Sequence, residues 1–175
     1  GACVAAVHIA VRDAAEPGET LLRVSGLSLD PASPFGTPLR HIGFEVRAGE
    51  VLGIGGVAGN GQDELLAALS GERPVAPGMV ELKDTPIGAT GPEDRRQRGL
   101  LCAPEERLGH AAAPDMSLIE NAVLTGRTRR ALARSGLIGW GRARAFAEEI
   151  IERFDVRTPG PHVAARALSG GNLQK

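Results

Sequence analysis

The sequence predicts an α/β fold, and three observations support this prediction. A glycine-rich segment over residues 51–71 runs from an apolar stretch into a helical pattern. Short apolar segments with the length of strands precede and follow it, separated by Gly, Pro and Asp residues that favour turns. From residue 108 onward, apolar residues recur at helical spacing instead. We therefore expect a strand-rich first part and a helical second part.

Composition and charge indicate a globular chain. Its 175 residues include 20 basic and 21 acidic ones, with a formal net charge of -1. This balance argues against binding to nucleic acid or to an anionic membrane surface. No apolar stretch approaches the roughly 20 residues of a membrane-spanning helix. Cys3 and Cys102 lie far apart, so we expect reduced thiols, with Cys102 buried, and the scattered histidines give no metal site.

The first part of the chain contains several expected strands. Residues 1–20 are expected to be a linker and the tail of a preceding segment. Strands are then expected over residues 21–29, 39–46, 79–83, 86–87 and 100–103, and a short charged helix over residues 92–98.

The central segment has the order of strand, glycine-rich loop and helix. The apolar run that starts at Val51 predicts the strand. Asp63 and Glu64 fall in the first turn of the helix, where the helix dipole favours acidic side chains. Gly71 is placed to end the helix, which should begin near Gly61. One helical face carries the apolar residues Leu65, Leu66, Ala68 and Leu69.

The loop matches the phosphate-binding pattern G-x-x-x-x-G-K-[ST] only in part. Gly56 and Gly61 occupy the glycine positions, but Gln62 stands at the lysine position and Asp63 at the hydroxyl position. The only lysines, Lys83 and Lys175, lie outside the loop. Backbone N–H groups can still hold phosphate. We interpret the loop as a nucleotide site with weakened chemistry.

Two alternatives stay open on the loop alone. The series Gly53, Gly55 and Ala58 also fits the dinucleotide pattern G-x-G-x-x-[GA], with Glu81 as its ribose-binding acid. That register would begin the helix near Val57 and enclose the glycines of residues 59–61, each at a cost of about 1 kcal/mol. The other alternative is a scaffold domain in which the glycines only shape a turn.

The second part predicts helices. Ser117 and Glu120 form a capping box that opens a helix ending near Leu124. A longer helix follows over residues 141–154, with a core-facing stripe. We expect Trp140 to pack between helices, and a surface contact is the alternative. The stripe comprises Phe146, Ile150 and Phe154, with Ala147 and Ile151 beside them. Residues 169–172, Ser-Gly-Gly-Asn before a helix, offer backbone N–H groups to an anion.

Three motifs in order resemble those of ATP-binding cassette domains: the glycine-rich loop, Pro104-Glu-Glu-Arg107 and residues 168–172. The resemblance covers residues 21–175. It implies a P-loop NTPase core of RecA-like type with an antiparallel β subdomain over residues 21–107, and a helical subdomain over residues 108–175. Within the family, the motifs are similar to those of the second cassette of tandem-cassette importers for simple sugars and nucleosides, with the loop closer to the nucleoside branch.

The resemblance implies a role for each motif. Glu105 would couple nucleotide binding to the permease, and Phe35 would stack on adenine. The signature motif, Leu168, Ser169, Gly170, Gly171 and Asn172, would contact ATP bound to an opposing cassette. No catalytic residue is assigned. The chain's own ATP would be held by Gly56, Gly59, Asn60, Gly61, Gln62 and Asp63. No residue is assigned to magnesium as a ligand, because Asp63 at the usual serine position could either bind the ion or repel the phosphates.

The resemblance also implies partners and a location. They are an opposing cassette, expected in the same longer protein, and transmembrane permease subunits on the cytoplasmic face of the plasma membrane. Because the sequence ends within the signature helix, the family's magnesium-binding acid, catalytic glutamate and switch histidine lie outside it. We expect the isolated chain to lack ATPase activity, and to self-associate through an incomplete core sheet.

Overall fold

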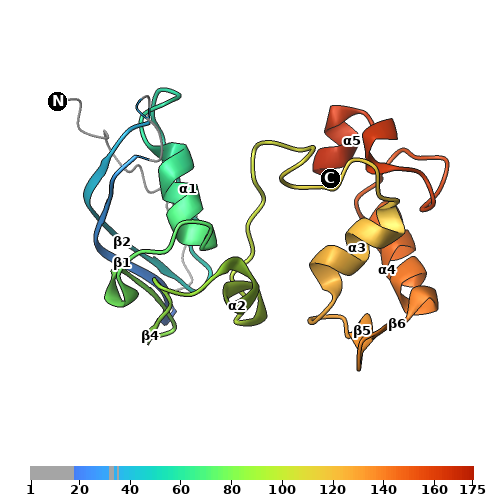
Figure 1. Ribbon diagram of the computed structural model, residues 1–175, viewed down its shortest axis with the longest axis horizontal. Coiled ribbons are helices and arrows are strands. Elements are labelled where there is room, and N and C mark those ends of the chain that lie inside the picture. The colour runs from blue at the N-terminus through green and yellow to red at the C-terminus, as the bar shows by residue number, and fades with distance from the viewer. Residues whose placement is uncertain (1–17, 32–33, 35) are drawn as a thin grey trace. The chain divides into compact units, whose positions relative to one another are not determined.

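The computed structural model describes residues 18–31, 34 and 36–175. The chain divides after Cys102 into two compact units, drawn in Figure 1. Unit 1 extends to Cys102, and unit 2 covers Ala103–Lys175. Each unit has its own hydrophobic core, so each is stabilised by contacts among its own elements.

Unit 1 is built on a four-stranded antiparallel sheet in the order β2-β1-β3-β4. The two long strands are β1 (Thr20–Leu29) and β2 (Leu39–Arg47), which confirms the strands expected over 21–29 and 39–46. The short strands β3 (Val80–Leu82) and β4 (Thr85–Pro86) follow a 3₁₀ turn, η1 (Pro77–Met79). They lie within one residue of the expected positions.

A bulge in β1 places two apolar residues on the same face of the sheet. Val24 and Leu27 are three positions apart and would face opposite sides of a regular strand. The pairing with β2 shifts between them, and Gly26 adopts a left-handed conformation with φ of 60°. The additional residue of the bulge returns Leu27 to the core side. Both side chains are therefore buried.

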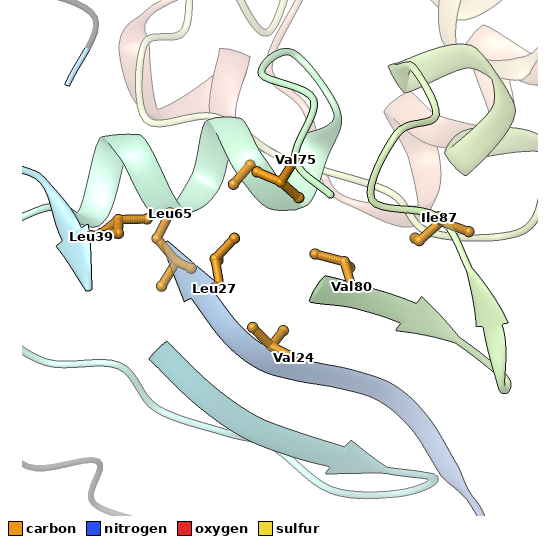
Figure 2. Close-up of a cluster of buried hydrophobic side chains, with 8 residues drawn as sticks. Val24, Leu27, Leu39, Leu65, Val75, Val80 and Ile87 are labelled. Atoms are coloured by element: carbon orange, nitrogen blue, oxygen red, sulfur yellow. The ribbon is translucent and has the colours of Figure 1, made fainter. Parts of the chain in front are cut away.

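Helix α1 (Gln62–Ser70) packs against this face of the sheet, as Figure 2 shows. It begins at the expected place, with Gly61 before it and Gly71 after it, both at positive φ. Its buried face carries Leu65 and Ala68. The cluster comprises Val24, Leu27, Leu39, Leu65, Ala68, Val75, Val80 and Ile87.

The end of α1 is fixed by a buried arginine from α2 (Pro92–Gln97). Arg95 is only 1% exposed, and its guanidinium donates to backbone carbonyls of two segments. Its Nη1 lies 2.5 Å from the Ala68 carbonyl and 2.8 Å from that of Leu69, both in the last turn of α1. Its Nη2 lies 2.8 Å from the carbonyls of Ile87 and Gly88. One side chain thus joins α1, α2 and the segment after β4.

The chemistry of this contact explains why an arginine can be buried there. The last carbonyls of a helix have no partner within the helix, and the helix dipole makes that end partly negative. The guanidinium donates hydrogen bonds to these carbonyls, and its positive charge is favourable at the negative end of the dipole. Burial nevertheless lowers the pKa of Arg95. Gly71 makes room: a Cβ at this position would lie 2.8 Å from Arg95 Nε and from the Thr90 carbonyl.

The structure corrects two expected strands. Residues 51–57 and 100–103 form no strand, and all pairings among the named strands are antiparallel. An extended segment becomes a strand only where a neighbour supplies hydrogen-bond partners, and none of the strands β1 to β6 pairs with these residues. Val51 is accordingly 81% exposed.

Cys102 was expected to be buried, and this prediction is wrong. The residue is exposed, because the segment that carries it is not held in a sheet. Its thiol pKa is nevertheless raised, mainly by partial desolvation and then by the negative charge of Glu72. A thiol with a raised pKa is a weak nucleophile at neutral pH.

Unit 2 contains the predicted helices and a small hairpin that the sequence did not predict. Helix α3 (Leu118–Gly126) begins at the expected capping box and extends two residues further than expected. Helix α4 (Trp140–Arg153) packs against it. The hairpin of β5 (Ala133–Arg134) and β6 (Leu137–Ile138) lies between them in sequence. A 3₁₀ turn, η2 (Ala165–Ala167), leads to α5 (Gly170–Gln174).

The core of unit 2 differs from the expected stripe. Of the predicted stripe, Ala147 is buried in the cluster and Phe146 packs against it, while Phe154 is 48% exposed. Trp140 is 53% exposed and is not part of the buried cluster, which favours the alternative of a surface position. The buried residues of α4 itself are the alanines at positions 143 and 147. The cluster comprises Ile119, Ala122, Val123, Leu132, Ala143 and Ala147.

We predict that Arg95→Met destabilises unit 1 by about 3–5 kcal/mol, because it leaves several buried carbonyls without a donor. Urea unfolding followed by circular dichroism measures this change. The matched variant Arg96→Met alters an exposed neighbour on the same helix and should stay within about 0.5 kcal/mol of the parent. Equal effects of the two variants would contradict the assigned role of Arg95.

The capping box predicts a dependence of stability on pH. Glu120 Oε2 accepts hydrogen bonds from Ser117 Oγ (2.7 Å) and Ser117 N (2.8 Å), which lower its pKa from the ordinary 4.5. A lowered pKa in the folded state gives stability that is present above the unfolded value and lost as the pH falls through the folded one.

We therefore expect Glu120→Gln to destabilise the chain at pH 7, by an amount that shrinks as the pH falls below 4.5. Urea midpoints of both proteins, measured from pH 7 to pH 3, provide the comparison. A stability difference that stays constant over this range would show that the carboxylate charge contributes nothing.

Candidate functional site

The glycine-rich loop of unit 1 is filled by the side chain at its lysine position. Gln62 Oε1 accepts a hydrogen bond from the Asn60 N–H at 3.0 Å, and Gln62 Nε2 donates to the Val57 carbonyl at 3.1 Å. A Cβ at Gly56 would lie 2.8 Å from Gln62 Nε2, so only glycine leaves room for this arrangement. The Gln62 amide thus lies within the curve of the loop.

Two further contacts hold the loop in place. Asn60 Nδ2 donates to the same Val57 carbonyl at 2.7 Å, and Thr37 Oγ1 donates to the Gly59 carbonyl at 2.8 Å. Glu64, in the first turn of α1, accepts from the Thr37 N–H at 3.0 Å. The predicted adenine-stacking residue Phe35 lies outside the described residues.

The charges at this loop do not favour a polyphosphate. A phosphate loop ordinarily offers free N–H groups and a lysine ammonium. Here the Asn60 N–H is already bonded to Gln62, and Asp63 and Glu64 add negative charge beside the N-terminus of α1. As folded, the Gln62 amide thus occupies one backbone donor, the Asn60 N–H, that a phosphate would otherwise meet.

The geometry rejects the dinucleotide register. That register requires a helix starting near Val57, whereas α1 starts at Gln62 and residues 51–57 precede it as an irregular segment. The proposed ribose-binding acid, Glu81, lies in β3, where its carboxylate is 3.2 Å from Arg23 Nη1. Glu81 therefore contributes to an ion pair on the sheet.

The second group of predicted residues lies in unit 2, at the start of α5. Ser169 is the N-cap residue, and its Oγ accepts a hydrogen bond from Asn172 Nδ2 at 3.0 Å. Asn172 Oδ1 in turn accepts from the Arg157 N–H at 3.0 Å. Lys175 Nζ donates to the Asp155 carbonyl at 2.6 Å. These bonds attach α5 to the segment that follows α4.

An arginine that the sequence did not single out lies beside this motif. Arg107 ends the Pro104–Arg107 motif, and a Cβ at Gly170 would collide with its guanidinium. Glycine at this position therefore permits the close approach of Arg107. Glu105, predicted to couple to a permease, is exposed. The two motifs of unit 2 are thus neighbours, although about sixty residues separate them in sequence.

The loop and the signature motif lie in different units, and all the residues of each motif belong to one unit. Sequence reasoning placed both but missed three of their contacts: the inward Gln62 amide, the tie through Thr37, and Arg107 beside Gly170. No residue type in the sequence indicates these contacts, because two of them involve backbone groups and the direction of a side chain.

The described residues hold no group of three or more His, Cys, Asp or Glu side chains suited to a metal ion. Among the helices described, none is both long and apolar enough to cross a bilayer.

Comparison with known proteins points to one family. Residues 39–175 match the ABC transporter family. The chain is 40% identical over 161 residues to the ribose import ATP-binding protein RbsA 3 of Rubrobacter xylanophilus, covering 92% of this chain and 30% of that protein. It is 35% identical over 162 residues to the guanosine import ATP-binding protein NupO of Bacillus subtilis, covering 93% and 32%.

A third relative, the nucleoside import ATP-binding protein NupA of Lactococcus lactis subsp. cremoris, is 31% identical over 167 residues, covering 95% of this chain and 33% of that protein. The chain spans about a third of the length of these curated relatives. Since the family match covers most of the chain and includes both groups of site residues, the chain belongs to the ABC transporter family, whose ATP-binding domains have the P-loop NTPase fold.

Proposed function

We propose that this chain is part of the ATP-binding subunit of an importer for nucleosides or simple sugars, and that its own phosphate loop is regulatory. The relatives named for ribose, guanosine and nucleoside import support the substrate class. The observation that carries the regulatory role is the Gln62 amide, which takes the Asn60 N–H that a phosphate would use. Gly59-Asn60-Gly61-Gln62 favours the nucleoside branch.

The signature motif, Leu168 to Asn172, completes the ATP site of an opposing cassette in this proposal. Gly170 and Gly171 carry no side chains, so a γ-phosphate can approach their backbone closely. Ser169 Oγ accepts from Asn172, which leaves its own proton to donate to a phosphate oxygen. Arg107 adds positive charge next to Gly170. ATP and magnesium bound to the opposing cassette would supply the reactive phosphoryl group.

Other site residues take secondary roles in the proposal. Glu105, exposed in the motif of residues 104–107, contacts the permease, and Phe35 stacks on adenine when nucleotide enters the loop. Gly56, Gly59, Asn60, Gly61 and Asp63 shape the entrance that Gln62 closes. Such a subunit would work at the cytoplasmic face of the plasma membrane through its permease.

The two motifs should differ in their importance for transport in the longer protein proposed here. Ser169→Arg should abolish transport-coupled ATP hydrolysis, because the larger side chain blocks the ATP of the opposing cassette. Gln62→Ala should leave most of the hydrolysis. The measurement is ATPase activity of the assembled transporter with and without its solute.

Gln174→Arg provides the matched control, since it places the same side chain at an exposed position of α5. It should retain activity. If Gln62→Ala proves as damaging as Ser169→Arg, the loop is catalytic and the proposed division of roles is wrong.

A lysine should convert the loop into a nucleotide site. Gln62→Lys removes the amide that occupies the loop and adds a charge-assisted contact to phosphate, which is worth about 1.5–3 kcal/mol. We expect the 175-residue chain carrying this change to bind ATP roughly tenfold or more tightly than the parent. Isothermal titration with and without magnesium measures the affinities.

The control for this experiment is Gln97→Lys, which adds the same charge at an exposed position on α2. An equal gain in the two variants would indicate a general charge effect. The absence of any gain in Gln62→Lys would contradict the view that Gln62 closes a loop of otherwise competent shape.

A further inference from the structure

Unit 2 contains a long basic segment, although the net charge of the whole chain is close to zero. Residues 121–147 contain no Asp or Glu, and all their charged residues are arginines. The net charge of -1 is a whole-chain value and does not describe this segment. The arginines are Arg127, Arg129, Arg130, Arg134, Arg142 and Arg144.

The hairpin β5–β6 projects from this segment. Its two-residue turn has Ser135 and Gly136 at φ of 50° and 79°, values typical of the tight turns that join paired strands. Leu132, at the base, is buried in the core of unit 2, and its carbonyl accepts from the Gly139 N–H at 2.8 Å. In Figure 1 the hairpin lies at the end of unit 2 away from α5. The base is therefore fixed while the tip is presented outward.

Apolar side chains gather at this tip and at the start of α4. Leu137 is 76% exposed, and Ile138 and Trp140 are exposed as well. Arg134 pairs directly with Leu137 across the hairpin, so a cation and an apolar side chain share one face. Large apolar residues concentrated on a surface usually mark an interaction site.

Three of the arginines have no acidic partner in the described part of the chain. Arg130 is paired with Glu149, and Arg144 with Glu148. Arg129, Arg134 and Arg142 are exposed and form no ion pair with any residue that the structure describes. Together with Leu137, Ile138 and Trp140 they form what we call the hairpin surface.

We propose that the hairpin surface docks on an anionic lipid membrane. Tryptophan and leucine side chains insert favourably at the boundary between headgroups and acyl chains, where the tryptophan N–H can remain hydrated. Unpaired arginines beside them are attracted to anionic headgroups. The proposal differs from the expectation drawn from net charge alone, because it rests on the local charge of one segment.

A lipid surface fits these observations better than a protein partner. The arginines belong to three different parts of the unit, since Arg129 precedes the hairpin, Arg134 lies in β5 and Arg142 in α4. A planar array of headgroups can meet all of them at once. Each arginine contributes about fivefold to the partition coefficient, so three contribute on the order of 100-fold.

Trp140 is the chain's single tryptophan, and the chain has no tyrosine, so its fluorescence reports on the proposed surface directly. We expect a blue shift of Trp140 emission with phosphatidylglycerol vesicles at low salt, reversed by high salt, and little change with phosphatidylcholine vesicles. Brominated lipids should quench the emission. The combined variant Arg129→Gln, Arg134→Gln and Arg142→Gln should weaken binding on the order of 100-fold.

The matched control is Arg96→Gln, Arg98→Gln and Arg157→Gln, which removes the same charge from exposed positions elsewhere. It should bind vesicles nearly as well as the parent, and circular dichroism verifies that both triple variants are folded. Leu137→Ser, which retains every charge, should reduce both binding and quenching.

Three results would overturn the proposal. One is the absence of a blue shift with anionic vesicles, as expected if a protein covers the surface. Another is equal loss of binding in the two triple variants. The last is a shift that depends on protein concentration without any vesicles, which would indicate a second copy of the chain on this surface. The proposal concerns residues outside the loop and the signature motif, so it does not depend on the proposed function.

Discussion

The buried guanidinium of Arg95 is the contact on which unit 1 depends. A sheet of two long and two short strands gives α1 a face to pack against, but packing alone leaves the final carbonyls of the helix without donors. Arg95 donates to those carbonyls and to the segment after β4, with Gly71 leaving the space it needs. At the opposite end of α1, Glu64 bonds to Thr37. The helix is thus fixed at both ends, and so is the loop that precedes it.

Because α1 is held at both ends, the position of its first residue, Gln62, relative to the loop is fixed as well. Gln62 points into the loop, accepts from the Asn60 N–H that a phosphate would otherwise meet, and donates to the Val57 carbonyl. The fold therefore retains the shape of a phosphate loop, while its interior is occupied by the protein itself. In unit 2, the start of α5 contains small residues and a serine hydroxyl with a proton to donate. This contrast supports assigning ATP contact in a longer protein to the signature motif.

The sequence predicted what depends on local pattern. It placed α1 between Gly61 and Gly71, the capping box at Ser117, and both long strands. Its predictions failed where the structure depends on residues distant in sequence. Residues 51–57 are largely apolar, yet no described strand pairs with them. Cys102 is exposed because its segment also has no paired strand beside it. The buried Arg95 was unpredictable because its partners are backbone carbonyls, which leave no mark on residue type. The direction of the Gln62 side chain was equally hidden, since a motif gives positions and not contacts.

The most direct test of the central claim, that Gln62 occupies its own phosphate loop, is amide hydrogen exchange of Asn60 in the parent chain. The bond from the Asn60 N–H to Gln62 Oε1 predicts protection of this amide without nucleotide and loss of that protection in Gln62→Ala. Fast exchange of this amide without nucleotide, with protection appearing only when ATP is added, would contradict the account, because it would mean that the loop is open and binds phosphate as folded.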